Sequence, residues 1–233
     1  MVKDTDPGHT KGSCGPKSFQ EPLISSMPFD EISDTSSFVT SFTNDPKSDF
    51  WAFAKGYTLA ANRLAASLLE APRFSDYEAY PVVFLYRHAL ELSLKHVIYG
   101  GVELAAFRRM DDINEKLKNN HDLVDLSRTA GKVLSLLFPN DEMLGGLNTS
   151  VAGICKDWSQ IDPRSDAYRY PIDTKGRPST KKHQVVNLRA LATRMAAVLE
   201  DLDTIHFGLN IETYKAQELY EILEQFVPSG DVP

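Results

Sequence analysis

The sequence predicts an all-α protein, an up-and-down helical bundle of four to five main helices with an irregular N-terminal arm. Three observations lead to this fold class. Apolar residues recur at spacings of three and four in the long segments after residue 45. No segment combines apolar–polar alternation over several residues with turn residues, as strands do. The 233 residues are 42% hydrophobic and 24% charged, which is typical of a chain that buries a core.

The first 45 residues are expected to form the irregular arm. They are rich in Gly, Pro, Ser, Thr and Asp, and two small apolar clusters at 22–24 and 38–39 would dock them on the bundle. The bundle is predicted over residues 46–227, and residues 228–233 should fray. The sequence has no apolar signal segment and no run of 18 apolar residues, so we expect a cytoplasmic protein without membrane contact.

The first two helices are predicted from apolar spacing and from proline and glycine. The first spans Ser48–Leu69, is rich in alanine, and is stopped by Pro72. The second is expected to begin at Pro81 and to be stopped after Tyr99 by two glycines. Twelve of the 18 residues 82–99 are apolar, so this helix should be central and largely buried.

The second half of the chain is predicted to hold further helices and one long loop. A short helical or irregular piece covers 103–120, and residues 161–182 read as a loop because turn residues dominate them. The helices are expected at His121–Phe138, Asp141–Gln160, His183–Leu209 and Glu212–Phe226.

An apolar heptad stripe runs along the segment 183–209. It either packs inside the bundle or forms the seam of a homodimer, and the first interpretation is favoured. Its members are Leu188, Leu191, Met195, Val198, Leu202, Ile205 and Leu209.

The net charge of −7 is unevenly distributed. Residues 156–195 hold 9 basic and 4 acidic groups, for +5, whereas residues 196–233 hold 1 and 8, for −7. The basic segment either pairs with the acidic end of the chain or offers a surface for phosphate. Overall acidity argues against broad non-specific binding of nucleic acid, but not against one local site.

A charged stripe interrupts the second, apolar helix. Arg87, Glu91 and Lys95 are four residues apart, so they share one helix face and can form two ion pairs. The structural interpretation is an ion-pair lattice that ties two helices together. The functional one is a cleft in which Arg87 holds phosphate while His88 or His121 moves protons.

Two further clusters are candidates for binding. His121 begins a predicted helix next to Asp122, a favourable capping residue, and is either functional or structural. Tyr168 and Tyr170 flank Arg169, as in sites that stack bases and contact phosphate. The alternative is a loop held on the bundle by a bond from Arg169 to a carboxylate such as Glu91.

The sequence holds no motif for a metal or a cofactor. The two cysteines, Cys14 and Cys155, are far apart, and neither a zinc-binding histidine motif nor a phosphate loop is present. We therefore expect no metal site and no cofactor.

Four features over about residues 46–210 together resemble a HEPN domain, the higher-eukaryote and prokaryote nucleotide-binding helical bundle. They are the Ala-rich helix with Tyr57 and Ala60-Ala61, Y-R-H-A-L-E-L-S-L-K at 86–95, H-D-L at 121–123, and S-D-A-Y-R-Y-P at 165–171. The resemblance implies a bundle that commonly dimerises and binds RNA or nucleotides. Many members are metal-independent endoribonucleases of toxin or phage-defence systems, which implies an antitoxin or defence partner.

Active members of that family carry an R-x(4–6)-H motif, whose Arg and His act on the RNA 2′-hydroxyl and the scissile phosphate across a dimer cleft. This chain has one such spacing, Arg177 to His183, at the start of the predicted last helix. Pro178 replaces the polar residue that usually follows the Arg. If this pair is not the site, then Arg87, His88 and Glu91 are the alternative.

Two functions are therefore predicted. The first is a HEPN-like metal-independent endoribonuclease or RNA-binding effector of bacterial defence, with His183 or His88 as proton acceptor and Arg177 or Arg87 as cation. The second is a non-catalytic module that acts through helix-mediated dimerisation or partner binding. An enzyme acting on a small molecule in the bundle core is a third possibility.

Overall fold

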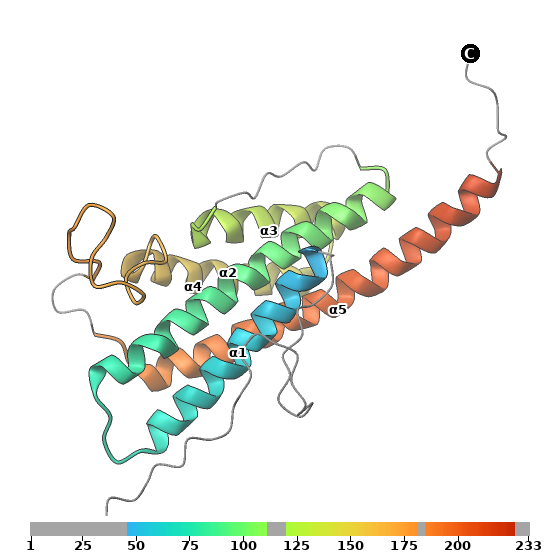
Figure 1. Ribbon diagram of the computed structural model, residues 1–233. Coiled ribbons are helices and arrows are strands. Elements are labelled where there is room, and N and C mark those ends of the chain that lie inside the picture. Colours follow the sequence, from blue (N-terminus) through green and yellow to red (C-terminus); the bar gives the residue numbers. More distant parts are fainter. Residues whose placement is uncertain (1–45, 111–119, 181–184, 227–233) are drawn as a thin grey trace, which may run out of the picture. The chain divides into compact units, whose positions relative to one another are not determined.

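The computed structural model describes residues 46–110, 120–180 and 185–226, and it confirms the predicted all-α class. These residues form five helices, with no strand beyond one isolated bridge between Ile172 and Pro178 (Figure 1). The predicted arm and the frayed tail lie outside the described residues. None of the described helices combines the length and the apolar character needed to cross a membrane. The helices are α1 (Pro46–Glu70), α2 (Asp76–Phe107), α3 (Leu123–Leu137), α4 (Glu142–Ile161) and α5 (Leu188–Phe226).

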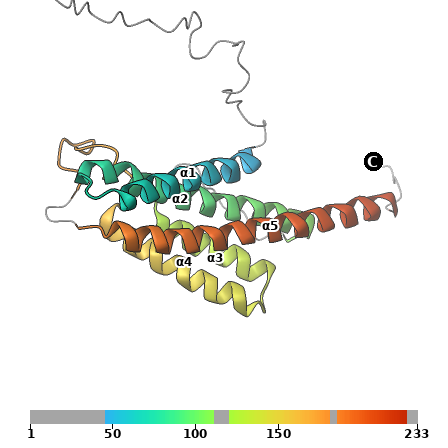
Figure 2. The same ribbon diagram turned by 90° about the horizontal axis from the view of Figure 1, so that it is seen from below.

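Helix α2 is the central element, as its apolar composition predicts. It contacts α1, α3 and α5, and half of its residues are buried. Helix α1 packs antiparallel against it through small side chains, among them Ala61 and Ala65, which let the two backbones approach closely. In Figures 1 and 2, α1 and α2 lie side by side.

The predicted ends of the second helix were wrong. The helix begins at Asp76, one turn before Pro81, because Ser75 and Glu78 form a capping box that satisfies the first free N–H groups. Pro81 lies inside this helix and removes one hydrogen bond. At the other end the helix continues through both glycines to Phe107. Gly101 is buried against α3, where a Cβ atom would lie 2.3 Å from Val133 Cγ1. The glycine therefore marks a helix contact rather than a helix end.

Helices α3 and α4 are confirmed close to their predicted limits. Each begins after an aspartate whose side chain accepts hydrogen bonds from the first turn, Asp122 for α3 and Asp141 for α4. Helix α3 runs in the same direction as α2, since Arg108 at the end of α2 donates to the carbonyl of Leu137 at the end of α3. This is the one parallel step in a bundle whose other consecutive helices are antiparallel (Figure 2).

The predicted last two helices are one continuous helix, α5, which begins at Leu188 rather than at residue 183. No proline interrupts residues 209–212, so backbone hydrogen bonding continues through them. All of the heptad stripe except Leu191 is buried within the bundle, which confirms the interpretation as core. From Asn210 onward the side chains of α5 are exposed or half-buried, and both ribbon views show this part extending past the neighbouring helices.

Candidate functional site

Arg87 is the centre of a buried polar network. Its side chain is 1% exposed, and both predicted ion pairs of the charged stripe are formed. Nη1 donates to Glu91 Oε2 at 2.9 Å, Nη2 to the His121 carbonyl at 2.8 Å, and Nε to the Asp162 carbonyl at 3.0 Å. This residue therefore joins α2 to the start of α3 and to the end of α4, as the structural interpretation of the stripe predicts.

Glu91 is buried, and its carboxylate contacts the exposed side chain of His121. Its Oε1 accepts a hydrogen bond from Lys95 Nζ at 2.9 Å and lies 2.8 Å from Nδ1 of His121. Burial by itself raises the pKa of Glu91, but the hydrogen bonds from Lys95 and His121 outweigh it and leave this pKa below its usual range. The His121 side chain is 56% exposed, against 2% for Glu91. A fixed, ionised carboxylate thus orients an accessible imidazole, although the two residues are 30 positions apart.

His88 is half-buried between aromatic rings. It stacks on Phe84 at 5.4 Å and meets the edge of Tyr57 from α1 at 4.6 Å. Burial lowers the pKa of His88, and nearby Arg169 also lowers it, while Glu91 opposes the change. The ring is therefore neutral at pH 7 and able to accept a proton.

The loop after α4 places the Arg169 cation and aromatic rings against α2. The Arg169 guanidinium lies over the rings of Phe84, at 5.7 Å, and Tyr170, at 5.0 Å, rather than on Glu91. Tyr168 meets Tyr80 edge-on at 5.9 Å. Arg169 and Tyr170 are exposed, so this side of α2 offers stacking faces and a positive charge.

This loop is held by Asp162 rather than by Arg169. The Asp162 carboxylate accepts hydrogen bonds from the backbone N–H groups of Asp166 and Ala167, and its backbone carbonyl receives Arg87. Ser165, with φ at 65°, makes the tight turn between them. Asp162 therefore holds both the buried network around Arg87 and the exposed aromatic loop in place.

Arg177 has a local structural role. Its Nε and Nη2 donate to Asp173 Oδ2 at 2.9 and 2.7 Å. The Arg177 backbone N–H donates to Asp173 Oδ1, and the Asp173 N–H donates to the Arg177 carbonyl. These bonds hold the pKa of Asp173 far below its usual range. The second member of the predicted motif, His183, lies outside the described residues, so the pair is not brought together by any described contact. The expectation that the pair lies at the start of a helix was wrong, since α5 begins at Leu188.

The basic segment 156–195 forms its ion pairs locally. Within the part of the chain that the structure describes, Arg164 and Arg177 pair with Asp173, and Arg194 pairs with Asp157. The carboxylates therefore come from the segment itself rather than from the acidic end of the chain.

The candidate site as a whole is a run of side chains along one side of α2, with partners from two loops. We call it the α2 stripe. It holds most of the predicted site residues, but not Arg177 or His183. Its members are Tyr80, Phe84, Arg87, His88, Glu91 and Lys95 on α2, and His121, Tyr168, Arg169 and Tyr170 from the loops.

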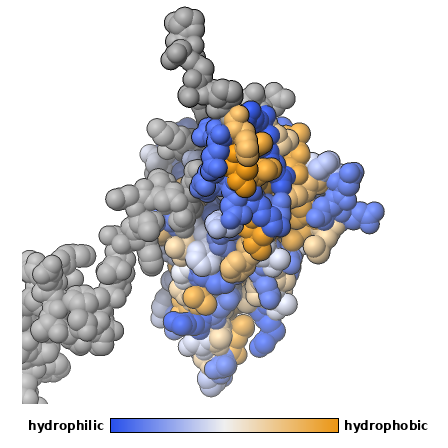
Figure 3. Space-filling model, turned by 90° about the vertical axis from the view of Figure 1, so that its right-hand side faces the viewer, coloured by the Kyte–Doolittle hydropathy of each residue, from blue (hydrophilic) through white to orange (hydrophobic). Residues whose placement is uncertain are grey.

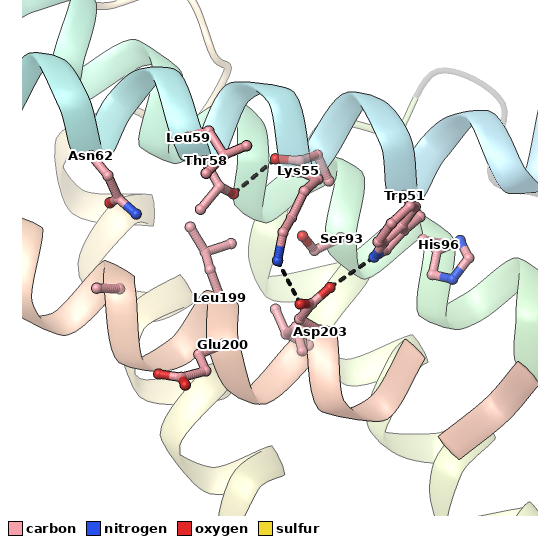
Figure 4. Close-up of a pocket in the computed structure, with 13 residues that line it drawn as sticks. Trp51, Lys55, Thr58, Leu59, Asn62, Ser93, His96, Leu199, Glu200 and Asp203 are labelled. Carbon is pink, nitrogen blue, oxygen red and sulfur yellow. Dashed lines mark hydrogen bonds and ion pairs between the residues drawn. The ribbon is translucent and has the colours of Figure 1, made fainter. Parts of the chain in front are cut away.

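A second polar site, which sequence reasoning missed, lies between α1, α2 and α5 (Figure 4). It is a cavity of about 300 Å³. Asp203 accepts hydrogen bonds from Trp51 Nε1 at 2.7 Å and Lys55 Nζ at 2.6 Å. Behind it, buried His206 stacks on Trp51, and its Nδ1 is 2.6 Å from Nε2 of His96. The available signal was the presence of histidines within the apolar patterns of α2 and α5.

This second site predicts an acid-dependent loss of stability. Burial lowers the pKa of His206 to about 4, and neighbouring His96 and Lys55 also lower it, although Asp203 opposes them. In the unfolded chain His206 takes up a proton near pH 6.5, whereas in the folded protein it does so only near pH 4. The free energy of unfolding should therefore fall by on the order of 2 kcal/mol as the pH drops from 6.5 to 4.

Urea unfolding of the native protein and the His206→Phe variant across this pH range measures the effect. The variant keeps a ring against Trp51 but loses the titrating group, so its stability should fall less on acidification. Equal slopes in the two proteins would contradict the assignment to His206.

Comparison with known proteins adds no further identification: no family model matches this chain, and neither a curated protein nor a solved structure is significantly similar to it.

Proposed function

We propose that this protein is a HEPN-like RNA-binding effector that cleaves RNA without a metal ion, in a bacterial toxin or phage-defence system. The observation that carries the proposal is the pair of Glu91 and His121, a buried carboxylate 2.8 Å from an accessible imidazole. Such a pair is the arrangement that general acid–base catalysis uses. The sequence resemblance at residues 86–95 and 121–123 covers these same side chains.

The reaction proceeds by attack of an RNA 2′-hydroxyl on the adjacent phosphate. His121 accepts the hydroxyl proton, the 2′-oxygen forms a bond to phosphorus, and the bond to the 5′-oxygen breaks. The leaving 5′-oxygen takes a proton from water, and His121 returns its proton to the solvent, so that the products are a 2′,3′-cyclic phosphate and a 5′-hydroxyl. Glu91 keeps the imidazole oriented through its contact with Nδ1. Arg169 supplies positive charge for the phosphates.

The exposed part of the α2 stripe suits single-stranded RNA. Any base can stack on an exposed aromatic ring, so this kind of binding has little sequence specificity. Tyr170 presents such a ring beside the Arg169 guanidinium. Tyr80, also exposed, extends the aromatic surface toward the start of α2. Arg87 supports this surface from beneath through Asp162 rather than by reaching the RNA.

Cleavage of total RNA by the purified protein in the presence of EDTA tests the proposal. His121→Ala should slow cleavage by about a hundredfold, because the general base is lost. Arg128→Ala, an exposed change on α3, the helix that follows His121, should leave the rate unaltered. Undiminished cleavage by His121→Ala would refute the role of His121, and a requirement for metal would refute the mechanism.

A non-catalytic module is the second candidate function. It is favoured by the complete engagement of Arg87, whose three nitrogens donate to partners inside the protein. An intact protein that binds no RNA and cleaves none would identify this second function.

A further inference from the structure

The cavity between α1, α2 and α5 combines polar groups with an apolar wall (Figure 4). Ala54 and Leu59 of α1 and Leu199 of α5 belong to this wall. Leu59 is 45% exposed, so part of the wall is open to solvent. A cavity of about 300 Å³ with such a lining can hold a small molecule and cover its apolar part.

Helix α1 places hydrogen-bond donors on one side of this cavity. Lys55 and Asn62 are seven residues apart, which is about two helix turns, so they share one face of α1. Lys55 Nζ donates to Asp203 at 2.6 Å, which uses one of the three N–H groups of the ammonium. Asn62 Oδ1 accepts a hydrogen bond from the Tyr86 hydroxyl at 2.8 Å, which leaves the amide N–H groups for another partner. The α1 side therefore suits an anionic group.

Helix α5 places carboxylates on the other side. Glu200 and Asp203 are three residues apart and both line the cavity. Asp203 already accepts two hydrogen bonds, whereas the exposed Glu200 carboxylate has no partner within the part of the chain that the structure describes. The end of α5 also exposes apolar side chains (Figure 3), but Glu212 there is ion-paired with Arg108 and Lys215. The α5 side of the cavity therefore suits a cationic group.

We propose that this cavity binds a small zwitterion, an α-amino acid with an apolar side chain. The ligand carboxylate accepts hydrogen bonds from Lys55 and Asn62, and its ammonium donates to Glu200. The ligand side chain packs against Leu59 and Leu199. No member of the α2 stripe lines this cavity, so binding here does not depend on RNA cleavage.

Nuclear magnetic resonance titration of the full chain with L-leucine tests this proposal. The chain has two tryptophans: the Trp51 indole N–H donates to Asp203 at the cavity, whereas that of buried Trp158 contacts Met195. L-Leucine should therefore shift the Trp51 indole signal and not that of Trp158, with a dissociation constant on the order of 1 mM or lower. Isoamylamine and 4-methylpentanoate, which each lack one of the two charged groups, should bind at least about tenfold more weakly.

Two variants test the contacts with the two charged groups of the ligand. Asn62→Asp keeps an acceptor for the Tyr86 hydroxyl but replaces the amide donor by a negative charge, and Glu200→Gln removes a charge while keeping the shape of the side chain. Each should weaken L-leucine binding at least about tenfold. Asp201→Asn is the matched control and should leave the affinity unchanged, because this exposed carboxylate lines a different cavity, between α3, α4 and α5.

Three results would overturn the proposal. One is the absence of any shift of the Trp51 signal at about 10 mM L-leucine. Another is equal affinity for L-leucine, isoamylamine and 4-methylpentanoate, a comparison that needs no variant. The third is L-leucine binding that Asn62→Asp and Glu200→Gln leave unaltered, once circular dichroism has shown that both variants are folded.

Discussion

Replacement of Arg87 by alanine is expected to lower the free energy of unfolding by about 3–5 kcal/mol. Arg87 is buried and bonds Glu91 and the carbonyls of His121 and Asp162 at once. Loss of the Arg87 side chain leaves the buried Glu91 carboxylate with only Lys95 and His121 as partners. The loop that begins at Asp162 also loses its hydrogen bond from Arg87. Urea unfolding followed by circular dichroism measures this change.

Arg128→Ala is the control for this prediction. Arg128 is also ion-paired, with Asp125, but its side chain is 60% exposed, so its removal should cost less than about 1 kcal/mol. Removing Glu91 together with Arg87 should cost less than the sum of the two single changes, because neither charge is then left alone. Equal, small effects of Arg87→Ala and Arg128→Ala would contradict the structural role of Arg87.

Gly101→Ala should destabilise the protein by about 2–3 kcal/mol, although alanine is by itself the better helix former. The added Cβ would lie 2.3 Å from Val133 Cγ1, well inside contact distance. Val133 is buried and β-branched, so its side chain has little freedom to turn away on helix α3. The helices must therefore separate, which loosens the core between α2 and α3. Thermal and urea unfolding provide the measurement.

The neighbouring glycine offers a matched control on the same helix. A Cβ at Gly100 would meet Leu209 Cδ1 at 3.6 Å, an ordinary contact, so Gly100→Ala should stabilise the protein by about 0.5–1 kcal/mol. Val133→Ala should recover part of the loss when combined with Gly101→Ala. Changes of the same sign at both glycines would show that the close contact between α2 and α3 is not the cause.

Part of the site was predictable because it depends on local spacing. Arg87, Glu91 and Lys95 form the ion pairs that their four-residue separation indicates. The pairing of Glu91 with His121 was not predicted, since 30 positions separate the two residues and an intervening change of direction brings them together. The position of Arg169 over Phe84 depends in the same way on how the loop after α4 folds back onto α2.

By itself the sequence determined the helical class, the order of the main helices and the cap at Asp122. These features follow from apolar periodicity and from hydrogen bonds within one turn, which are properties of neighbouring residues. Only the tertiary structure decided where helices end and which polar groups meet. Gly101 looks like a helix end until α3 is placed against it. Trp51 and Asp203, 152 positions apart, bond because three helices pack together, and packing is a property of the whole chain.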